Sequence, residues 1–586
     1  FSCPPRRYKI YGACMKKHWH IRQPDPKKVT RLSKALNCYP VTASVLVNRD
    51  ILTQKAAYDF INVSLKNLHP PFALKETHAA VHRIYEAIMA NEKILIFGDY
   101  DVDGITSTVL LSDFFQQIGA DVTYYIPHRV TEGYSIQPRH IVEHAVPNHI
   151  SLIITADCGS SSHQAVESAR DFGIDIIITD HHNIAENIPP ALAVINPKRK
   201  DCTTGLEHLA GVGVAFCLII SLRKYLRDKG FWQNRKEPNL KNFCDLVTLG
   251  TVADMVPLVA DNRIFCKTGL EVIVSGQRPG LSALMEVSAI DIDYVDAEDI
   301  AFRLAPRINA AGRIDHASKA FELLTATDAT RAANLAADLN ALNQKRQQQE
   351  KQIIEHIQDL LKQSPKILDQ TSLVLARPNW HAGVLGIVAS RITEMYNRPS
   401  VVITIEEGLG KGSARSIPGL NLYESLARCS EYLESFGGHA MAAGLTIREE
   451  RIPEFQNTFE KMIQRKSQGK DLVPKIWIDA ELDFAQISGA LIDELESLMP
   501  FGAGNPEPLF MARDIEVVTS KKVGKYHRRM VLRQSTGNPR QTFTAIHFNV
   551  DERTFQKDRF DQIVFKLQWN RWNERKTAQI VIEDQR

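Results

Sequence analysis

The sequence lacks the features that mark secreted, zinc-framework or membrane-spanning proteins. Its nine cysteines include no Cys-x-x-Cys pair, so we expect reduced, mostly buried thiols in a cytoplasmic protein. The longest apolar candidate, residues 210–222, is too short to span a bilayer and contains two glycines. The N-terminus is basic but has no apolar segment of the signal-peptide type. Met15 is a plausible natural start, so residues 1–14 are expected to be an upstream extension.

A large excess of either charge is also absent. The total of +3 neither favours nor excludes a nucleic-acid ligand. The distribution is uneven, however, because residues 521–586 contain 15 Lys and Arg against seven Asp and Glu, a net charge of +8, which leaves −5 for the preceding residues. A basic end on a mildly acidic body is typical of an enzyme with a polyanion-binding appendage.

The chain, at 586 residues, is too long for one hydrophobic core and alternates two kinds of pattern. Buried strands at about 94–97, 122–126, 152–155 and 175–179 alternate with helical stretches, which predicts a parallel α/β sheet. Residues 314–363 are nearly free of Gly and Pro and predict a long connecting helix. A second α/β segment follows, and after Pro474 short strands separated by turns predict a small β-barrel. The expected units are an N-terminal helical extension (1–90), a first α/β domain (91–325), a connecting helix (326–365), a second α/β domain (366–470) and a barrel (471–586).

Acidic residues gather where predicted strands end. GDYDVDG at 98–104, ADCG at 156–159 and DHH at 180–182 each follow a strand, and VADMVP at 252–257 follows a helix-like stretch. The carboxyl ends of parallel strands converge on one crevice. We therefore expect a single cluster made of Asp101, Asp103, Asp157, His181 and Asp254.

Such a cluster predicts bound cations, because so many carboxylates cannot lie together ionised without them. Carboxylates with an imidazole suit Mn²⁺ or Mg²⁺, and the histidine favours Mn²⁺. Two ions about 3.5–4 Å apart would clamp a phosphodiester and generate a nucleophilic hydroxide, with Asp157 shared between them. An Asp after a strand can also be a helix cap or a turn former, and His181-His182 could be a loop pair, so the prediction depends on all four segments together.

The four segments resemble, in order, the four motifs of the DHH phosphoesterase superfamily. Beyond the first domain the chain resembles the bacterial RecJ exonucleases of that superfamily, and the resemblance extends from about residue 40 onward. The further segments are PRINAAGR at 306–313, WHAGVLGIVASR at 380–391, KGSAR at 411–415, GGH at 437–439 and PFGAGNP at 500–506. The resemblance implies an α/β fold: a parallel-sheet DHH catalytic domain, joined by the long helix to a DHH-associated substrate-binding α/β domain, and a C-terminal barrel of the OB type.

The resemblance also implies roles for the clustered residues. The five residues of the cluster would ligate two Mn²⁺ or Mg²⁺ ions, while Asp99, Asp180 and His182 would orient ligands or handle protons. His182 is either a general acid toward the leaving oxygen or only a hydrogen-bonding group. Phe97 stands where pyrophosphatase-type relatives have a ligating histidine, a departure that fits the nuclease branch and leaves one ion with fewer protein ligands.

The second domain is implied to hold phosphates. Ser413, Arg415 and His439 match the family's phosphate-contacting positions, and a guanidinium binds phosphate oxygens through two parallel hydrogen bonds. The glycines at 437–438 would let the backbone approach a strand closely. Further candidates are Arg129, Arg307, Arg313 and His381, although the motif around His381 could equally serve packing.

The barrel interleaves basic and aromatic residues that suit single-stranded nucleic acid. They are Lys521, Lys522, Lys525, Arg528, Arg529, Trp569, Arg571 and Trp572. Tryptophans that pack in the core of a basic domain would give the same pattern.

The function implied by the resemblance is 5′→3′ digestion of single-stranded DNA to nucleoside 5′-monophosphates in recombination and repair. The resemblance suggests a monomer that works with single-strand binding protein and a RecQ-type helicase. One alternative is a small-substrate DHH hydrolase acting on short oligonucleotides, cyclic dinucleotides or pyrophosphate, which the basic barrel argues against. Another is a binding protein that has lost the chemistry, which the competent residue at every metal-ligand position argues against.

Overall fold

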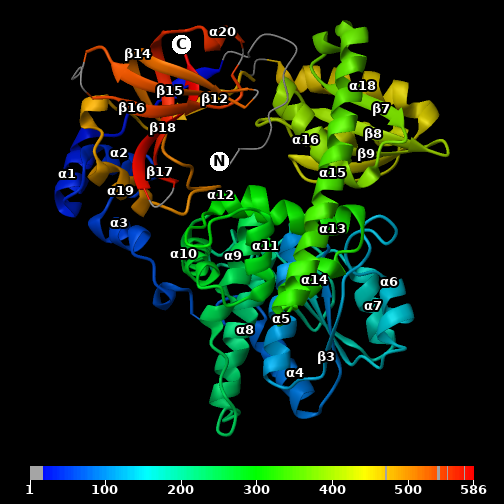
Figure 1. Ribbon diagram of the computed structural model, residues 1–586. Helices are drawn as coiled ribbons and strands as arrows, with labels where there is room; N and C mark the ends of the chain where they lie inside the picture. The colour runs from blue at the N-terminus through cyan, green and yellow to red at the C-terminus, as the bar shows by residue number, and fades with distance from the viewer. Residues whose placement is uncertain are drawn as a thin grey trace.

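The computed structural model describes residues 17–70, 72–468, 472–524, 526–536, 541–550, 552–572 and 575–586. The predictions for residues 1–14 and for Lys525 lie outside these ranges, and so does any statement about the Trp572 side chain. Figure 1 shows three lobes: a lower domain, a second α/β domain at the far end of one long helix, and a barrel lobe that contains the C-terminus.

The lower domain is built on a five-stranded parallel sheet. Its strands are β2 (Ile94–Gly98), β3 (Val122–Tyr125), β4 (Leu152–Ala156), β5 (Asp175–Thr179) and β6 (Ala193–Ile195). The order β3-β2-β4-β5-β6 makes β2, β4 and β5 neighbours, and all pairs are parallel. The segments that follow these three strands therefore emerge at the same edge of the sheet. Every residue of β2 and β4 is buried, which explains their continuously apolar sequences.

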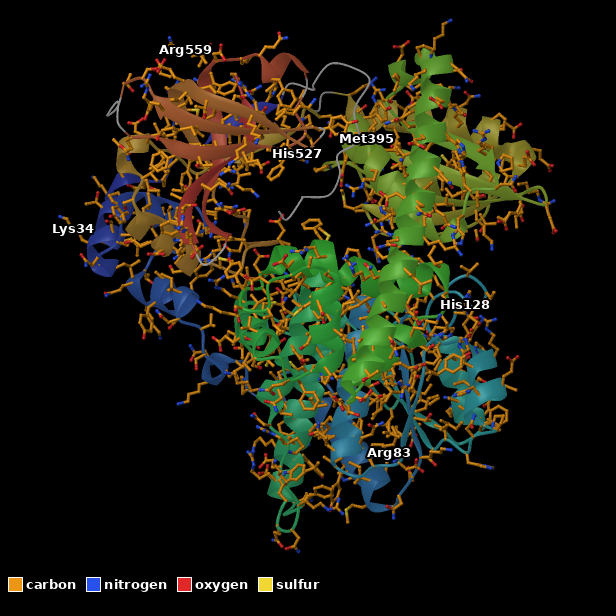
Figure 2. All side chains as sticks on the ribbon, viewed as in Figure 1. Lys34, Arg83, His128, Met395, His527 and Arg559 are labelled. Atoms are coloured by element: carbon orange, nitrogen blue, oxygen red, sulfur yellow. The ribbon has the colours of Figure 1, made fainter. Side chains whose placement is uncertain are left out.

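Helices cover both faces of this sheet and continue into a helical subdomain. They are α4 (Thr77–Met89), α5 (Val102–Gln117), α6 (Pro138–His140), α7 (His163–Asp171), α8 (Gly211–Asp228), α9 (Cys244–Ala253), α10 (Ala260–Val274), α11 (Pro279–Val287), α12 (Ala297–Asp299), α13 (Ala305–Ile314) and α14 (Ser318–Thr325). In α4, Val81 and Ile84 lie in the domain's core. Arg83, labelled in Figure 2, donates hydrogen bonds of 2.6 Å to Asp175 and Glu92. By its packing, α4 belongs with the sheet although its residues precede position 91.

The predicted connecting helix is confirmed as α15 (Ala329–Gln363), a single helix of 35 residues. It begins later than the predicted stretch at 314, because α14 ends at Thr325 and the Asp328 side chain caps a new helix. It is also a core element at both ends, since Ala336 packs in the lower domain and Ile354 in the second domain. Between these two apolar ends, the buried Arg346 donates to Asn343 and Glu350 at 2.6 and 2.8 Å. The helix is therefore anchored on both sides.

The second domain has a mixed five-stranded sheet in the order β10-β11-β9-β8-β7. Its elements are β7 (Leu373–Pro378), α16 (Leu385–Tyr396), β8 (Ser400–Glu406), β9 (Leu409–Arg415), α17 (Leu422–Ala427), β10 (Leu433–Gly438), β11 (Ala442–Arg448) and α18 (Ile452–Ser467). Only the β7–β8 pair is parallel. This order brings the KGSAR segment at the end of β9 beside the loop between β10 and β11.

The C-terminal residues form the predicted barrel. Its elements are β12 (Lys475–Ile478), β13 (Ala480–Glu481), α19 (Gly489–Ser497), β14 (Phe510–Val523), β15 (His527–Gln534), β16 (Phe543–His547), α20 (Glu552–Phe555), β17 (Arg559–Trp572) and β18 (Arg575–Gln585). The sheet runs β14-β15-β16-β18-β17 and closes because β17 pairs with β14 as well. The predicted α/β, connecting-helix and barrel architecture is therefore confirmed.

The first residues of the chain pack on this barrel. They form β1 (His18–Ile21), α1 (Pro26–Leu36), α2 (Pro40–Val47) and α3 (Gln54–Ile61). β1 pairs in parallel with β12, and Leu32, Leu46 and Ala57 share one apolar core with Leu491 and Phe510. Residues 17–61 thus belong structurally with the far end of the chain, while the other predicted domain boundaries stay predictions.

Two further sequence expectations concern the whole chain. In the parts that the structure describes, no helix combines the length and apolar character needed to cross a bilayer. The seven cysteines in those parts are free thiols, and four of them are buried: Cys158, Cys244, Cys266 and Cys429.

Candidate metal centre and phosphate-binding residues

The predicted acidic cluster forms around His181. Its Nε2 lies 3.2 Å from Oδ1 of Asp157, 3.5 Å from Oδ2 of Asp254 and 3.7 Å from Oδ2 of Asp103. His181, Asp157 and Asp254 follow β5, β4 and α9, and Asp103 lies in the first turn of α5, so residues up to 151 positions apart in sequence contribute to one site. The structure thus brings together residues from all four predicted segments.

The cluster offers more than one position for a cation. Three groups of ligand atoms, each with its members within 4.8 Å of one another, are Asp103-His181-Asp254, Asp157-His181-His182 and Asp99-Asp101-Asp157. Asp157 belongs to two of these groups, as expected for a carboxylate shared between ions. Asp99, predicted to orient ligands or handle protons, is itself close enough to Asp101 and Asp157 to ligate.

The electrostatics of the cluster fit a divalent cation. Burial, and then the charge of Asp101, raise the pKa of Asp103 to about 7; burial and Asp103 raise the pKa of Asp254 to about 8. Burial and Asp103 also raise the pKa of Asp157 well above its ordinary value. Burial and the neighbouring His182 lower the pKa of His181 to about 3, which keeps its imidazole neutral and able to ligate. Asp157 Oδ1 and His181 Nε2 are buried and make no hydrogen bond, as expected of ligand atoms.

The backbone holds the carboxylates in place at close range. Asp157 has a φ of 64°, in the left-handed region that non-glycine residues rarely adopt. Asp103 accepts hydrogen bonds from the N–H groups of Gly211 (2.6 Å) and Val212 (2.9 Å) at the start of α8. A Cβ atom at Gly211 would lie 2.4 Å from Asp157 Oδ1, and one at Gly250 would lie 2.8 Å from Asp103 Oδ1. Neither glycine was predicted; the available signal was Gly211-Val-Gly213 inside an otherwise apolar run.

Asp101 combines two predicted roles. One of its oxygens, Oδ1, accepts from the N–H groups of Asp103 (3.0 Å) and Gly104 (3.1 Å) and so caps α5. Helix capping, weighed against metal binding from the sequence, is therefore real at this position. The cap also fixes the carboxylate beside Asp157, so the two roles are compatible.

The buried Asp180 and the partly exposed His182 form a pair beside the cluster. Asp180 accepts from the backbone N–H groups of His181 (2.7 Å) and Ser160 (2.9 Å), and from Nδ1 of His182 (2.8 Å). Burial alone would raise the pKa of Asp180, but these hydrogen bonds bring it below its ordinary value. Burial likewise opposes the charge on His182, yet Asp180 raises the pKa of His182 to about 9, so this imidazole is protonated at neutral pH.

Tyr134 is an unpredicted member of the site. Its hydroxyl lies 3.1 Å from His182 Nδ1 and donates to the carbonyl of Asp157 at 3.3 Å. The residue lies in the loop between β3 and α6, where the sequence offers no motif that would identify it.

Three of the predicted phosphate-binding arginines form a positive group. Burial, and then the charges of Arg129, Arg346 and Arg415, lower the pKa of Arg313 to about 9. Burial and Arg129 also lower the pKa of Arg415. In the described parts of the chain, no carboxylate makes an ion pair with any of Arg129, Arg313 and Arg415. An anion such as phosphate would relieve this repulsion.

The second domain reaches the metal cluster through His439. This residue follows β10, and its ring lies 6.3 Å from that of His182 with an interplanar angle of 18°. On β9, Nη1 of Arg415 donates to Ser413 Oγ at 3.2 Å. A Cβ at Gly386 would lie 2.9 Å from Arg415 Nη2, so the first turn of α16 leaves room for this guanidinium.

The remaining two candidates for phosphate binding, His381 and Arg307, make hydrogen bonds within the protein. His381 Nδ1 accepts from the N–H of Gly383 (3.1 Å), so this ring caps a short turn. Arg307 donates to Asn340 (3.0 Å) and to the carbonyl of Arg303 (2.6 Å), which joins α13 to α15. That either residue contacts phosphate stays a prediction.

Among the barrel residues, Arg528 corrects the sequence prediction. Its side chain is fully buried, and its guanidinium donates to Ser520 Oγ and to the carbonyls of Thr554 and Lys557 at 2.7–2.8 Å. A buried arginine that cross-links the barrel cannot meet DNA on the surface. Lys521, Lys522 and Arg529, in contrast, are exposed where β14 pairs with β15.

Trp569 and Arg571 on β17 contact α19. Trp569 Nε1 donates to Asp493 (2.8 Å), and Lys576 lies 4.6 Å from the centroid of its ring. Arg571 donates to both oxygens of Glu496 at 2.8 and 2.6 Å. These contacts favour the packing alternative for Trp569 and pair the Arg571 guanidinium with a carboxylate, and DNA contact by either residue remains a prediction.

The raised carboxylate pKa values predict a pH-dependent stabilisation by metal. In the metal-free protein, Asp103 and Asp254 have higher pKa values in the folded state than in the unfolded state, so they stabilise the fold at low pH. This contribution is lost as the pH rises through their folded pKa values of about 7 and about 8. Divalent ions stabilise the ionised forms, and binding releases protons. We expect the gain in Tm between EDTA and MgCl₂ or MnCl₂ to grow from pH 6 to pH 8 in thermal unfolding. An equal gain at both pH values would contradict the cluster's assignment.

Comparison with protein-family models identifies three matches along the chain. The DHH family, N-terminal domain, matches residues 93–251; the DHHA1 domain matches residues 369–465; the RecJ OB domain matches residues 478–584. The order agrees with the three lobes of the structure.

Individual proteins match over most of the chain. A protein of Bacillus subtilis (strain 168) named single-stranded-DNA-specific exonuclease RecJ is 36% identical over 577 residues, covering 97% of this chain and 71% of the relative. Its namesake from Escherichia coli (strain K12) is 37% identical over 534 residues, covering 89% and 92%. The crystal structure of RecJ in complex with Mn²⁺ from Thermus thermophilus aligns with a TM-score of 0.82 at 28% identity, covering 97% of this chain and 79% of that one.

Proposed function

The chain belongs to the RecJ family of single-stranded-DNA-specific exonucleases, and from this premise we propose how its own residues carry out the reaction. It is a metal-dependent exodeoxyribonuclease that hydrolyses phosphodiester bonds of single-stranded DNA in the 5′→3′ direction, releases nucleoside 5′-monophosphates and serves recombination and repair. Its cofactor is Mn²⁺ or Mg²⁺. One observation in the chain itself supports this activity most strongly. Carboxylate oxygens of Asp103, Asp157 and Asp254 all lie within 3.7 Å of His181 Nε2.

Five residues are proposed to hold the two ions. They are Asp101, Asp103, Asp157, His181 and Asp254, with Asp157 shared. When bound, the ions neutralise the carboxylates and supply Lewis acidity toward the scissile phosphodiester. The carboxylate of Asp180 fixes the backbone of His181 and the ring of His182, so that both imidazoles keep their orientation.

His182 is proposed as the proton donor to the leaving oxygen. Its Nδ1 is engaged by Asp180, which leaves the proton on Nε2 for transfer. A pKa of about 9 keeps this proton in place at neutral pH, and one third of the side chain is exposed to a substrate.

Phosphates of the strand are proposed to bind between the two α/β domains. Arg129 and Arg313 approach from the catalytic domain, and Arg415, Ser413 and His439 from the second domain. Because both α/β domains contribute cations, a single strand can bind between them, whereas the second strand of a duplex would clash with the protein. Lys521, Lys522 and Arg529 on the barrel would contact the strand farther along.

The partners and the cellular setting are proposed from kinship with the family. The chain would act as a monomer in the cytoplasm, on strands delivered by single-strand binding protein and a RecQ-type helicase. The shared single-stranded DNA substrate is what would bring these proteins together.

A time course on end-labelled DNA tests the activity. With Mn²⁺ or Mg²⁺, a 5′-labelled single strand should release its label as mononucleotide from the first time point, whereas a 3′-labelled strand should shorten progressively. A blunt duplex should stay intact, and EDTA should stop the reaction. Faster hydrolysis of a dinucleotide than of a long strand would instead favour a small-substrate phosphoesterase.

A further inference from the structure

A two-stranded ribbon outside the closed barrel presents basic and aromatic side chains on one face. In the β1–β12 pair, His18 lies opposite Lys475 and His20 opposite Trp477. Side chains alternate between the two faces of a strand. One face packs against Met511 and Val564 of the barrel through Trp19, Ile21, Ile476 and Ile478. The other face therefore carries His18, His20, Lys475 and Trp477, and Arg22 follows directly after β1.

Trp477 is the centre of this ribbon face. It is 52% exposed and is the only tryptophan among the exposed large hydrophobic side chains that the structure describes. The guanidinium carbon of Arg22 lies 5.2 Å from its ring centroid, and the ring of His20 lies 5.0 Å away at an interplanar angle of 32°. Since Ile476 and Ile478 already anchor β12, the exposed ring is not needed to hold the strand in place.

The charges around the ring suit a polyanion. Arg22 and Lys475 are both exposed. The carboxylate of Asp479 lies 4.0 Å from Arg22 Nε, but it is buried and accepts hydrogen bonds from Asn48 (3.1 Å) and from the N–H of Leu509 (3.3 Å). The Asp479 carboxylate is therefore held inside the protein by these hydrogen bonds, while the Arg22 side chain stays 39% exposed beside the Trp477 ring.

The ribbon is continuous with the sheet of the barrel. One residue separates β12 from β13, and β13 pairs in parallel with β14. Figure 1 shows β12 on the barrel lobe, away from the strands of the catalytic sheet. A ligand on the ribbon face would thus lie on a different lobe from the metal cluster.

We propose that the ribbon face is a second contact site for single-stranded DNA, where one base stacks on Trp477 while Arg22 and Lys475 contact neighbouring phosphates. A flat exposed ring flanked by cations is the combination that sequence-independent single-strand binding requires. The inference rests on the proposed function for the identity of the ligand. It extends the path of the strand beyond the barrel, so it concerns long strands and not the chemistry at the metal cluster.

Binding of a fluorescent 40-nucleotide strand to the full chain in EDTA tests this site. Trp477→Ala should weaken binding by about fivefold or more, the lower end of what stacking of one base contributes, whereas Trp477→Phe should retain most of the affinity. Arg22→Ala combined with Lys475→Ala should reduce the slope of log Kd against log salt by roughly 0.7 for each lost phosphate contact. Tyr58→Ala is the matched control, because Tyr58 is an aromatic residue 62% exposed on α3, outside the ribbon.

Hydrolysis of short strands separates this inference from the proposed function. With Mn²⁺, Trp477→Ala should degrade a strand of about eight nucleotides as fast as the parent while losing efficiency on the 40-nucleotide strand. Unchanged binding of the long strand by Trp477→Ala would overturn the inference. Equal losses on short and long strands, or the same loss in Tyr58→Ala, would also overturn it. If the parent chain degraded neither strand, the proposed function itself would be wrong.

Discussion

Replacing Asp157 by alanine is expected to lower the turnover of single-stranded DNA by at least about a thousandfold. This carboxylate belongs to two of the three groups of possible metal ligands, so its loss weakens both ion positions. A bound divalent ion contributes several kcal/mol to the stabilisation of transition-state charge, and each 1.4 kcal/mol or so corresponds to tenfold in rate. Initial rates of mononucleotide release with saturating Mn²⁺ measure the effect, and binding of a long strand should largely survive because the arginines are intact.

The same variant should be more stable than the parent when no metal is present. Burial and neighbouring carboxylates raise the pKa of Asp157, which means that its ionised form destabilises the metal-free fold. We therefore expect a higher Tm in EDTA and a smaller gain on adding metal. Asp245→Asn is the matched control: Asp245 is equally buried in the same domain but pairs with Arg278 at 2.8 Å, so its loss should lower the Tm and leave turnover nearly unchanged. Near-parental turnover in Asp157→Ala would contradict the ligand assignment.

Replacing Arg415 by alanine is expected to raise the KM for single-stranded DNA by about 10- to 100-fold. This range corresponds to losing one or two charge-assisted hydrogen bonds to phosphate. Without DNA the variant should lose little stability, because Arg415 has no acidic partner among the described residues and its charge is repelled by Arg129. Arg415→Lys should recover part of the affinity, since lysine restores the charge but not the two-pronged hydrogen bonding.

Steady-state kinetics on oligonucleotides of one length separate this role from a structural one. Arg391→Ala is the matched control, because Arg391 lies in the same domain and is also partly buried, but it already pairs with Glu350 at 3.3 Å. That variant should lose stability with little change in KM. If Arg415→Ala lowered the Tm and left KM unchanged, its guanidinium would be a packing group and not a phosphate ligand.

The cluster could be predicted from the sequence because its geometry follows from topology. Strands β2, β4 and β5 are neighbours in a parallel sheet, so Asp101, Asp157 and His181 had to meet wherever these strands end. Asp254 lies at the end of α9 and not after a strand, so the strand-end argument did not cover it; it joined the expected cluster as a fourth acidic segment that follows a helix-like stretch. The long helix was predictable from the near absence of Gly and Pro, and the barrel from short predicted strands separated by turns.

The features that the sequence did not predict depend on contacts between residues far apart in the chain, which a local sequence pattern does not show. Gly211 and Gly250 matter because distant carboxylates approach their Cα atoms. Arg528 looked like a surface cation because it stands beside Arg529, but neighbours along a strand point to opposite faces, and this one enters the barrel. The N-terminal helices looked like an independent extension because their partners lie more than 400 residues away.

The union of residues 17–61 with the barrel constrains how the molecule can fold during synthesis. The catalytic sheet, α15 and the second domain consist of residues that leave the ribosome in one continuous stretch, so they can fold as they emerge. Residues 17–61, in contrast, are synthesised first, and their apolar faces stay exposed to solvent until the last strands of the chain have been synthesised. This N-terminal segment is where a chaperone would be needed most. A nascent chain halted before residue 510 should have a folded catalytic domain and an N-terminal segment that is sensitive to protease.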